Sequence, residues 1–152
     1  MGAFADDAAE RLRDAPAGRV ESHTWTTGRY VGRTPVDVAG DRQPLLLVEL
    51  EWLRADSANN AVKLFCHLAE GGLDGDIRLF QAFTRYYDLQ SGGVSSKRKN
   101  AEFVGERIAV TADGVACVPL TPNIDPPKLG GQRPNDWKAA TERTADRIEA
   151  RS

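Results

Sequence analysis

Apolar residues recur along the chain at two spacings, and each spacing predicts a kind of element. Intervals of three to four residues are typical of a helix with one buried face, whereas alternation is typical of a strand. Phe4, Ala8 and Leu12 follow one another at intervals of four, and Pro16 and Gly18 then predict the end of a helix. On this pattern, helices are expected over residues 4–15, 57–70, 95–110 and 136–150.

Five other segments have the composition of strands, being rich in β-branched and aromatic residues and separated by turn residues. Strands are expected over residues 22–33, 34–41, 44–53, 77–87 and 115–120. A hairpin centred on Gln43 would pair the second of these strands with the third. The fourth has apolar side chains on both faces and is reached through a helix, which predicts a βαβ crossover and parallel pairing.

Two of the helices have a face that we expect to be buried. Asp56 or Ser57 is expected to cap the second helix. Its apolar face is expected to consist of Ala58, Ala61, Val62, Phe65, Leu68 and Ala69. In the third helix, Ala101, Val104 and Ile108 are expected to point inward.

The elements follow one another as helix, three strands, helix, strand, helix, strand, helix. This order predicts an α/β protein, a three-layer α/β/α sandwich around a mixed central sheet. A chain of 152 residues fits one domain of ordinary size. Its core is expected at about 4–120, followed by a Pro- and Gly-rich loop at 121–135 and the last helix.

Composition and charge narrow the class of protein. The chain is 41% apolar and 28% charged, with 20 Lys and Arg against 22 Asp and Glu, a net charge of −2. This balance excludes a uniformly basic nucleic-acid-binding surface but leaves room for a local basic patch. No apolar run is long enough to span a bilayer, and the acidic N-terminus lacks the apolar region of a signal peptide. We therefore expect a soluble cytoplasmic protein with no membrane partner. Cys66 and Cys117 both lie in apolar runs, and we expect them to be buried free thiols.

The third strand, residues 44–53, carries the first candidate chemistry. Leu46, Val48, Leu50 and Trp52 form one apolar face, while the other face changes from Leu45 and Leu47 to Glu49 and Glu51. The expected hairpin brings Asp37 opposite Glu49. Three carboxylates on a largely buried strand would repel one another unless a cation such as Mg²⁺ offset their charge. Alternatively, the strand emerges into solvent at residue 49 and the two glutamates are surface acids.

The sequence Pro35-Val36-Asp37, followed after eleven residues by Glu49-Leu50-Glu51, resembles the motif of the PD-(D/E)XK, or restriction-endonuclease-like, nucleases. The core of that family also runs helix, three strands, helix, strand, and the resemblance covers roughly residues 4–90. It implies a restriction-endonuclease-like fold and hydrolysis of DNA phosphodiesters with Mg²⁺ or Mn²⁺. Asp37 and Glu49 match the metal-ligating acids of the family.

One position departs from the family pattern, because Glu51 stands where most members have lysine. A minority of members have Glu there, so the resemblance implies that Glu51 orients or deprotonates the attacking water. In other members the following helix supplies the lysine, and Lys63 is the only lysine on that helix here; the alternative for Lys63 is a solvated surface residue. Glu10 is a candidate for the additional acid that the family takes from its first helix.

A DNA substrate requires local positive charge, and residues 77–107 supply it with six cations against three acids, a net +3. The candidate DNA-binding residues are Arg85, Lys97, Arg98 and Lys99. Two serines and a helix N-terminus next to three of these cations favour a phosphate cradle. The alternative is a solvated basic start of a helix. Asn59 and Asn60 could reach DNA or cap their own helix, and capping is the simpler interpretation.

Three hypotheses follow. The first is a small Mg²⁺-dependent DNA nuclease, and the second is a catalytically silent module of the same fold that binds nucleic acid or a partner protein. The third is an unrelated α/β interaction protein, which would be favoured if residues 35–51 formed no hairpin. In a chain this short, sequence specificity would have to come from loops, from a homodimer or from a partner subunit.

Overall fold

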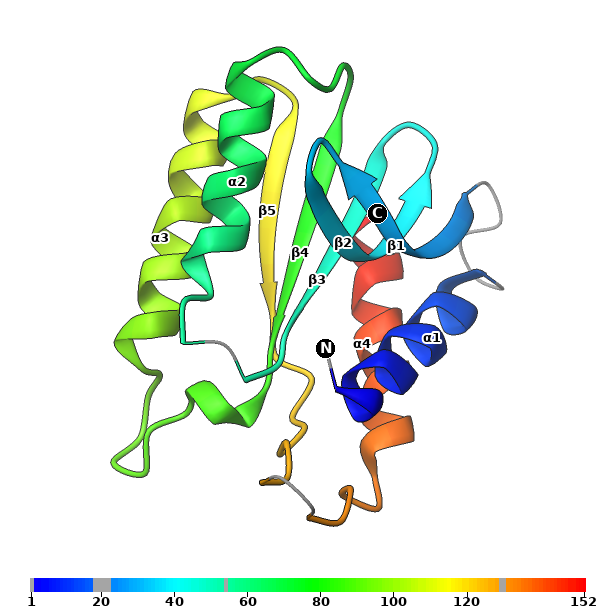
Figure 1. The fold of residues 1–152 in the computed structure, drawn as a ribbon, viewed down its shortest axis with the longest axis vertical. Coiled ribbons are helices and arrows are strands. Elements are labelled where there is room, and N and C mark those ends of the chain that lie inside the picture. Colours follow the sequence, from blue (N-terminus) through cyan, green and yellow to red (C-terminus); the bar gives the residue numbers. More distant parts are fainter. Residues whose placement is uncertain (1, 18–22, 54, 129–130) are drawn as a thin grey trace.

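The structure, a computed structural model, describes residues 2–17, 23–53, 55–128 and 131–152. A five-stranded sheet lies between two layers of helices (Figure 1). The strands are β1 (Thr24–Val31), β2 (Thr34–Asp41), β3 (Leu45–Glu51), β4 (Ile77–Phe83) and β5 (Val115–Leu120). The helices are α1 (Ala3–Ala17), α2 (Ala58–Ala69), α3 (Ser96–Thr111) and α4 (Trp137–Arg151), with a short 3₁₀ helix at Arg85–Tyr87. The expected α/β sandwich with a mixed sheet is confirmed.

The sheet has the order β1-β2-β3-β4-β5, and its pairing changes once, from antiparallel to parallel, at β3. Strands β1 to β3 form an antiparallel meander, and β3, β4 and β5 run parallel to one another. Helix α2 connects β3 to β4 and helix α3 connects β4 to β5, as parallel pairing requires. The β2–β3 ladder pairs Val38 with Val48, which are symmetric about Gln43, so the predicted hairpin and its centre are confirmed.

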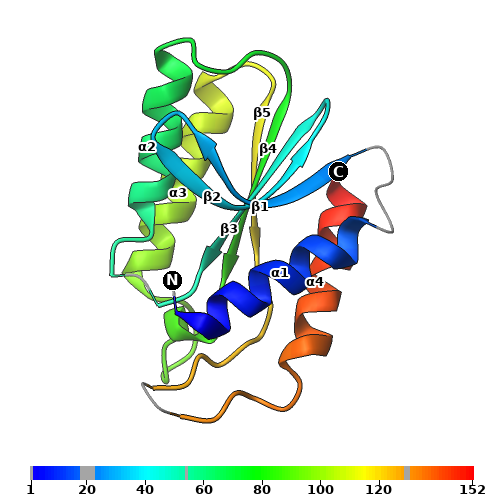
Figure 2. The same ribbon diagram turned by 45° about the vertical axis from the view of Figure 1, so that its right-hand side comes forward.

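Each face of the sheet has its own apolar core. Helices α1 and α4 pack against each other on one face, and α2 and α3 cover the other (Figure 2). Leu46, Val48 and Leu50 of β3 lie in the core beneath α1 and α4, while Leu45 and Leu47 lie in the core beneath α2 and α3. The predicted alternation along β3 is therefore confirmed, and it assigns Glu49 and Glu51 to the α2/α3 side.

Strand β4 is shorter than predicted. It ends at Phe83, not at residue 87, and the chain turns into the 3₁₀ helix, which leaves Tyr86 40% exposed and Tyr87 buried. The neighbouring strands end at Glu51 and Leu120, so a longer β4 would have no strand to pair with. The first helix is longer than predicted and ends at Ala17. The predicted stop at Gly18 lies outside the described residues.

The buried face of α2 differs from the predicted one. Ala61 and Leu64 point into the core, whereas Val62 is 41% exposed. Cys66 is exposed as well, so the prediction of a buried thiol was wrong for this residue. Cys117 on β5 is partly buried, and the loss of solvent raises the pKa of its thiol to about 11. None of the described helices combines the length and the apolar character needed to cross a bilayer.

Candidate functional site

The carboxyl ends of β3 and β4 and the amino ends of α2 and α3 meet at one edge of the sheet, which we call the carboxyl edge. The N–H of Thr84, directly after β4, donates to the carbonyl of Glu51 at 3.3 Å. The hydroxyl of Ser57, directly before α2, donates to the carbonyl of Lys97 in the first turn of α3 at 3.1 Å. Open α/β sheets commonly bind ligands outside the carboxyl ends of their strands, so this edge is where a site is expected.

Buried polar side chains are concentrated at the carboxyl edge. In the described chain the buried polar or charged residues at this edge are Glu49, Glu51, Ser57, Asn60, Gln81, Thr84 and Arg98. The other two, Thr141 and Thr144, bond to carbonyls of their own helix, α4. Burying polar groups is costly unless they are hydrogen-bonded, so their concentration at one edge of the sheet makes this edge the candidate site.

Both glutamates of β3 are inside the protein. Glu51 is 0% exposed and its Oε1 accepts a hydrogen bond from Nδ2 of Asn60 on α2 at 3.2 Å. Glu49 is 4% exposed and lines a cavity of about 10 Å³, the space of roughly one water, with Leu64 and Leu79. All of β3 is buried, so the alternative in which the strand emerges into solvent at residue 49 was wrong. The interpretation of Asn60 as a local cap was wrong too, because its side chain reaches β3.

The side chain of Asp37 reaches the backbone of β3 between the two glutamates. Its Oδ2 accepts a hydrogen bond of 2.6 Å from the N–H of Leu50, the residue between Glu49 and Glu51. The pairing of β2 with β3 ends at Val38 and Val48, so Asp37 lies one residue outside the paired segment, and the residue of β2 next to it, Val36, lines the cavity of Glu49. The structure thus brings the three predicted acids onto adjacent strands. Asp37 also lines a groove of about 400 Å³ to which α1 contributes Glu10, the residue proposed as the additional acid.

Whether these residues suit a divalent cation depends on how many protein ligands the ion needs. Among the described residues, no group of three or more His, Cys, Asp and Glu side chains is arranged to hold a metal ion. Two carboxylates suffice for Mg²⁺, which keeps several waters and takes other ligands from substrate phosphates. Asp37 and Glu49 are hard oxygen donors on facing strands, so the chemistry of this pair fits Mg²⁺ or Mn²⁺.

Lys63 lies on α2 and is exposed to solvent, as a surface lysine would be. The residues of this helix that face the protein interior are Asn60, Ala61 and Leu64. From α2, it is therefore the neutral amide of Asn60 that contacts a glutamate of β3, by donating a hydrogen bond to Glu51.

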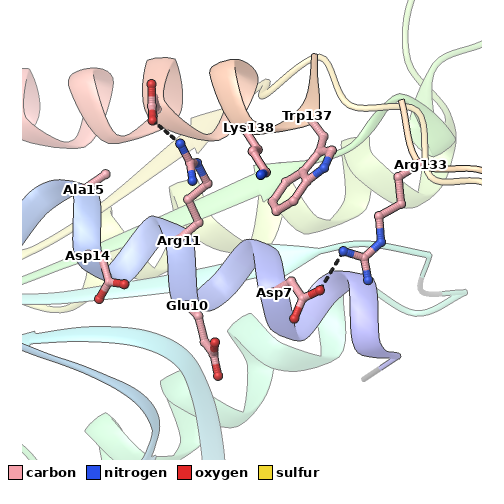
Figure 3. Close-up of a pocket in the computed structure, with 9 residues that line it drawn as sticks. Asp7, Glu10, Arg11, Asp14, Ala15, Arg133, Trp137 and Lys138 are labelled. Carbon is pink, nitrogen blue, oxygen red and sulfur yellow. Dashed lines mark hydrogen bonds and ion pairs between the residues drawn. The ribbon is translucent and has the colours of Figure 1, made fainter. Parts of the chain in front are cut away.

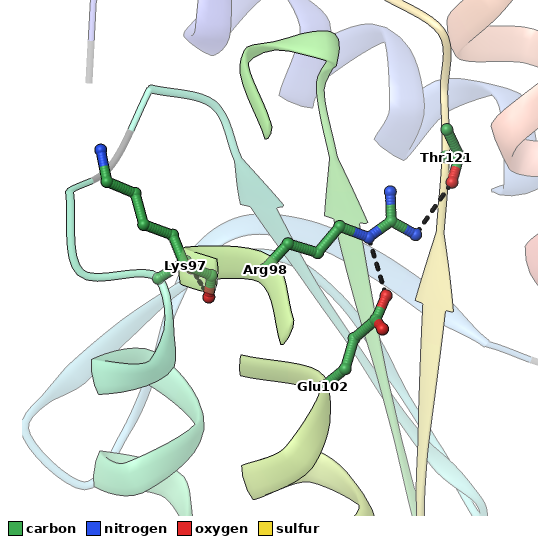
Figure 4. Close-up of polar contacts among 5 residues, drawn as sticks. Lys97, Arg98, Glu102 and Thr121 are labelled. Atoms are coloured by element: carbon green, nitrogen blue, oxygen red, sulfur yellow. Dashed lines mark hydrogen bonds and ion pairs between the residues drawn. The ribbon is translucent and has the colours of Figure 1, made fainter. Parts of the chain in front are cut away.

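Arg98 points into the protein, in contrast to the cradle expected at the start of α3. It is 8% exposed and donates to Glu102 at 2.7 Å and to Thr121 at 3.0 Å (Figure 4). It also stacks on the ring of Phe83, with 4.8 Å between the guanidinium carbon and the ring centroid. These contacts tie the first turn of α3 to the ends of β4 and β5. Arg98 is thus an internal ion-paired group, and its spacing of four residues from Glu102 is a sequence signal for such a pair.

The three other candidate DNA-binding cations remain on the surface. Lys97 points away from Arg98 (Figure 4) and donates to the hydroxyl of Tyr86 at 2.9 Å. Arg85 is exposed and pairs with Asp125 at 3.3 Å, a pair that solvent screens. Lys99 is exposed. The carboxyl edge therefore has buried carboxylates with surface cations next to them.

Gln81 is a residue of this edge that sequence reasoning missed. It lies on β4, is 2% exposed and pairs in register with Glu49 of β3. One polar residue within the otherwise apolar run of residues 79–83 is the signal that could have identified it.

A second recess, of about 760 Å³, lies between α1 and α4 on the opposite layer (Figure 3). Arg133 pairs there with Asp7 at 2.6 Å and stacks on the ring of Phe4, and Arg11 pairs with Glu142 of α4. Since these side chains join α1 to α4 and to the loop before it, we assign the recess a structural role.

Comparison with known proteins assigns the chain to no family. No protein-family model matches the chain, and no curated protein is significantly similar to it.

Proposed function

We propose that the protein is a restriction-endonuclease-like nuclease that hydrolyses DNA phosphodiesters with Mg²⁺ or Mn²⁺. The observation that carries this proposal is the position of the Asp37 carboxylate, bonded to the N–H of Leu50 between Glu49 and Glu51. An acid from β2 is thereby bonded to the segment of β3 that carries two further acids. The order of α1, β1 to β3, α2 and β4 agrees with the core order of the PD-(D/E)XK nucleases and supports the same proposal.

In this proposal each side chain of the carboxyl edge has a separate task. Asp37 and Glu49 would hold the cation, which when bound lowers the pKa of a coordinated water and stabilises negative charge on the phosphate. Glu51 orients the attacking water and accepts its proton, and the hydrogen bond from Asn60 fixes its carboxylate. Lys97, Lys99 and Arg85 attract the DNA backbone.

The test is cleavage of supercoiled plasmid by the purified chain in Mg²⁺ and in Mn²⁺. The decisive variant is Asp37→Asn, because an amide oxygen can still accept from Leu50 N–H while the charge is lost. The matched control is Asp41→Asn, on the same strand, where the carboxylate pairs with Arg29 at 3.1 Å. We expect cleavage by the wild type and by Asp41→Asn, and a loss of about 100-fold or more in Asp37→Asn, in the range typical for removal of one electrostatic catalytic group. Equal rates for wild type and Asp37→Asn would refute the proposal.

The second candidate is a module of the same fold that binds nucleic acid or a partner protein without cleavage. Two observations favour it: Glu51 takes the place of the family's lysine and is fully buried, and Lys63 faces solvent. This candidate predicts that wild type and Asp37→Asn bind a fluorescent duplex oligonucleotide equally and that neither cleaves it. The condition that favoured an unrelated interaction protein is not met, because residues 34–51 do form a hairpin.

Two further parts of the proposal concern the protein's surroundings. We propose that loops, a homodimer or a partner subunit provide target specificity, and light scattering with and without DNA tests the dimer. The two free thiols favour a reducing compartment, and we propose the cytoplasm.

A further inference from the structure

Gln81 carries a buried amide donor that has no acceptor. The residue is 2% exposed, and its Nε2 makes no hydrogen bond within the part of the chain that the structure describes. A buried donor left without a partner destabilises a fold, whereas an apolar side chain of the same shape does not. The stability of the sheet therefore gives no reason for an amide at this position.

The nearest acid in the sheet is Glu49. Glu49 and Gln81 are register partners on the parallel strands β3 and β4, and paired residues project from the same face of a sheet. Helix α3 closes over the amide at Gly105, where an added Cβ would lie 3.3 Å from Oε1 of Gln81. The glutamine is thus confined beneath α3, on the strand adjacent to Glu49.

The other glutamate has a similar neighbour. Glu51 accepts a hydrogen bond from the amide of Asn60, so each glutamate of β3 has a neutral amide at its side. An amide N–H stabilises an ionised carboxylate without cancelling its charge, and the carboxylate keeps its attraction for a cation. Partners of this kind orient metal ligands and raise metal affinity in proteins generally.

We propose that Gln81 is a positioning residue of the metal site, whose Nε2 donates a hydrogen bond to the Glu49 carboxylate when that carboxylate holds a divalent cation. The inference rests on the proposed function, because it takes Asp37 and Glu49 as the ligands. It goes beyond the family motif, since Gln81 lies on a strand that contributes no residue to that motif.

The experiment titrates the full-length chain with Mn²⁺ alone in a calorimeter. The test variant is Gln81→Met, which keeps the length and shape of the side chain and removes the donor. The control is Thr144→Val, equally buried but on the opposite layer in α4. We expect Mn²⁺ to bind Gln81→Met at least about 10-fold more weakly than wild type, as removal of a partner to a metal ligand generally does. Thr144→Val should bind like wild type, and the Tm of Gln81→Met should equal or exceed that of wild type.

The outcomes separate this inference from the proposed function. Asp37→Asn, titrated in parallel, reports on the ligand pair itself. If wild type binds Mn²⁺, Asp37→Asn does not, and Gln81→Met binds like wild type, the role of Gln81 is overturned while the metal site stands. If wild type binds no Mn²⁺, both are overturned. Should Gln81→Met fail to fold, as judged by circular dichroism, Gln81→Leu replaces it with the same expected result.

Discussion

Replacement of Arg98 by methionine tests which cations at the start of α3 stabilise the fold and which of them bind DNA in the proposed function. Arg98 and Lys99 are neighbours in sequence, but Arg98 is 8% exposed while Lys99 faces solvent. Methionine keeps most of the apolar stem of arginine and removes the guanidinium. Arg98→Met therefore deletes the contacts with Glu102, Thr121 and Phe83 without opening a large cavity.

The magnitude follows from those contacts. A hydrogen bond to a charged group contributes ~1.5–3 kcal/mol. Arg98 makes two such bonds, and its stacking on Phe83 adds ~0.5–2 kcal/mol. Against this, release of the arginine side chain returns ~2 kcal/mol of rotamer entropy. Glu102, whose side chain is 28% exposed, can turn to water when its partner is lost. We expect Arg98→Met to lower the free energy of unfolding by about 2–4 kcal/mol.

Urea denaturation followed by circular dichroism measures that change, and Lys99→Met is the matched control. An exposed lysine without a structural partner changes stability by no more than ~0.5 kcal/mol. For DNA binding we expect the opposite ranking, with the larger effect in Lys99→Met. Lys99→Met should weaken binding to a duplex and lower the slope of log K against log salt by ~0.9, one phosphate contact. Arg98→Met, assayed under conditions where it is folded, should leave that slope unchanged. A stable Arg98→Met variant with a reduced salt slope would contradict the assignment of Arg98 as an internal group.

Three other predictions test the remaining features. Asp37→Ala removes the acceptor of Leu50 N–H and should lower the free energy of unfolding by ~1–3 kcal/mol, while Asp37→Asn should cost less; equal costs in urea denaturation would argue against this bond. Cys66 should react with Ellman's reagent at pH 8 in the native protein and Cys117 should not, so mass spectrometry should find one labelled thiol. Because the folded pKa of Cys117, about 11, lies above the reference value of 9.0, the unfolded chain loses this proton first, and stability should fall as pH rises from about 9 to about 11; in Cys117→Ala that part of the pH dependence should disappear.

Much of the fold follows from periodicity because the relevant interactions are local or repetitive. The alternation of leucine and valine along residues 45–50 determines which side of β3 meets which helical layer. The centre of the hairpin follows from the turn at Gln43, since antiparallel pairing is symmetric about its turn. Once these two are known, the approach of Asp37 to the segment of β3 that carries Glu49 and Glu51 follows as well.

Features that depend on neighbouring elements could not be predicted in the same way. β4 ends at Phe83 because the strands beside it end, and nothing in the residues 84–87 themselves prevents an extended conformation. Cys66 is exposed because α2 is rotated so that Leu64, and not Val62, faces the sheet. The bonds from Asn60 to Glu51 and from Arg98 to Thr121 join residues whose proximity is created by the two βαβ crossovers.

Under the proposed function, those crossovers also account for a DNA site on a chain with a net charge of −2. Parallel strands end at a common edge, so the acids at the end of β3 and the cations at the start of α3 are neighbours although Glu51 and Lys97 are far apart in sequence. Burial separates the two signs: Glu49 and Glu51 lie inside, and Lys97 and Lys99 lie outside. In the proposed nuclease, a phosphate approaching this edge would meet the cations before the carboxylates, and a divalent cation would join it to the buried acids. Binding of DNA and binding of metal should therefore strengthen each other, because each supplies charge that the other lacks.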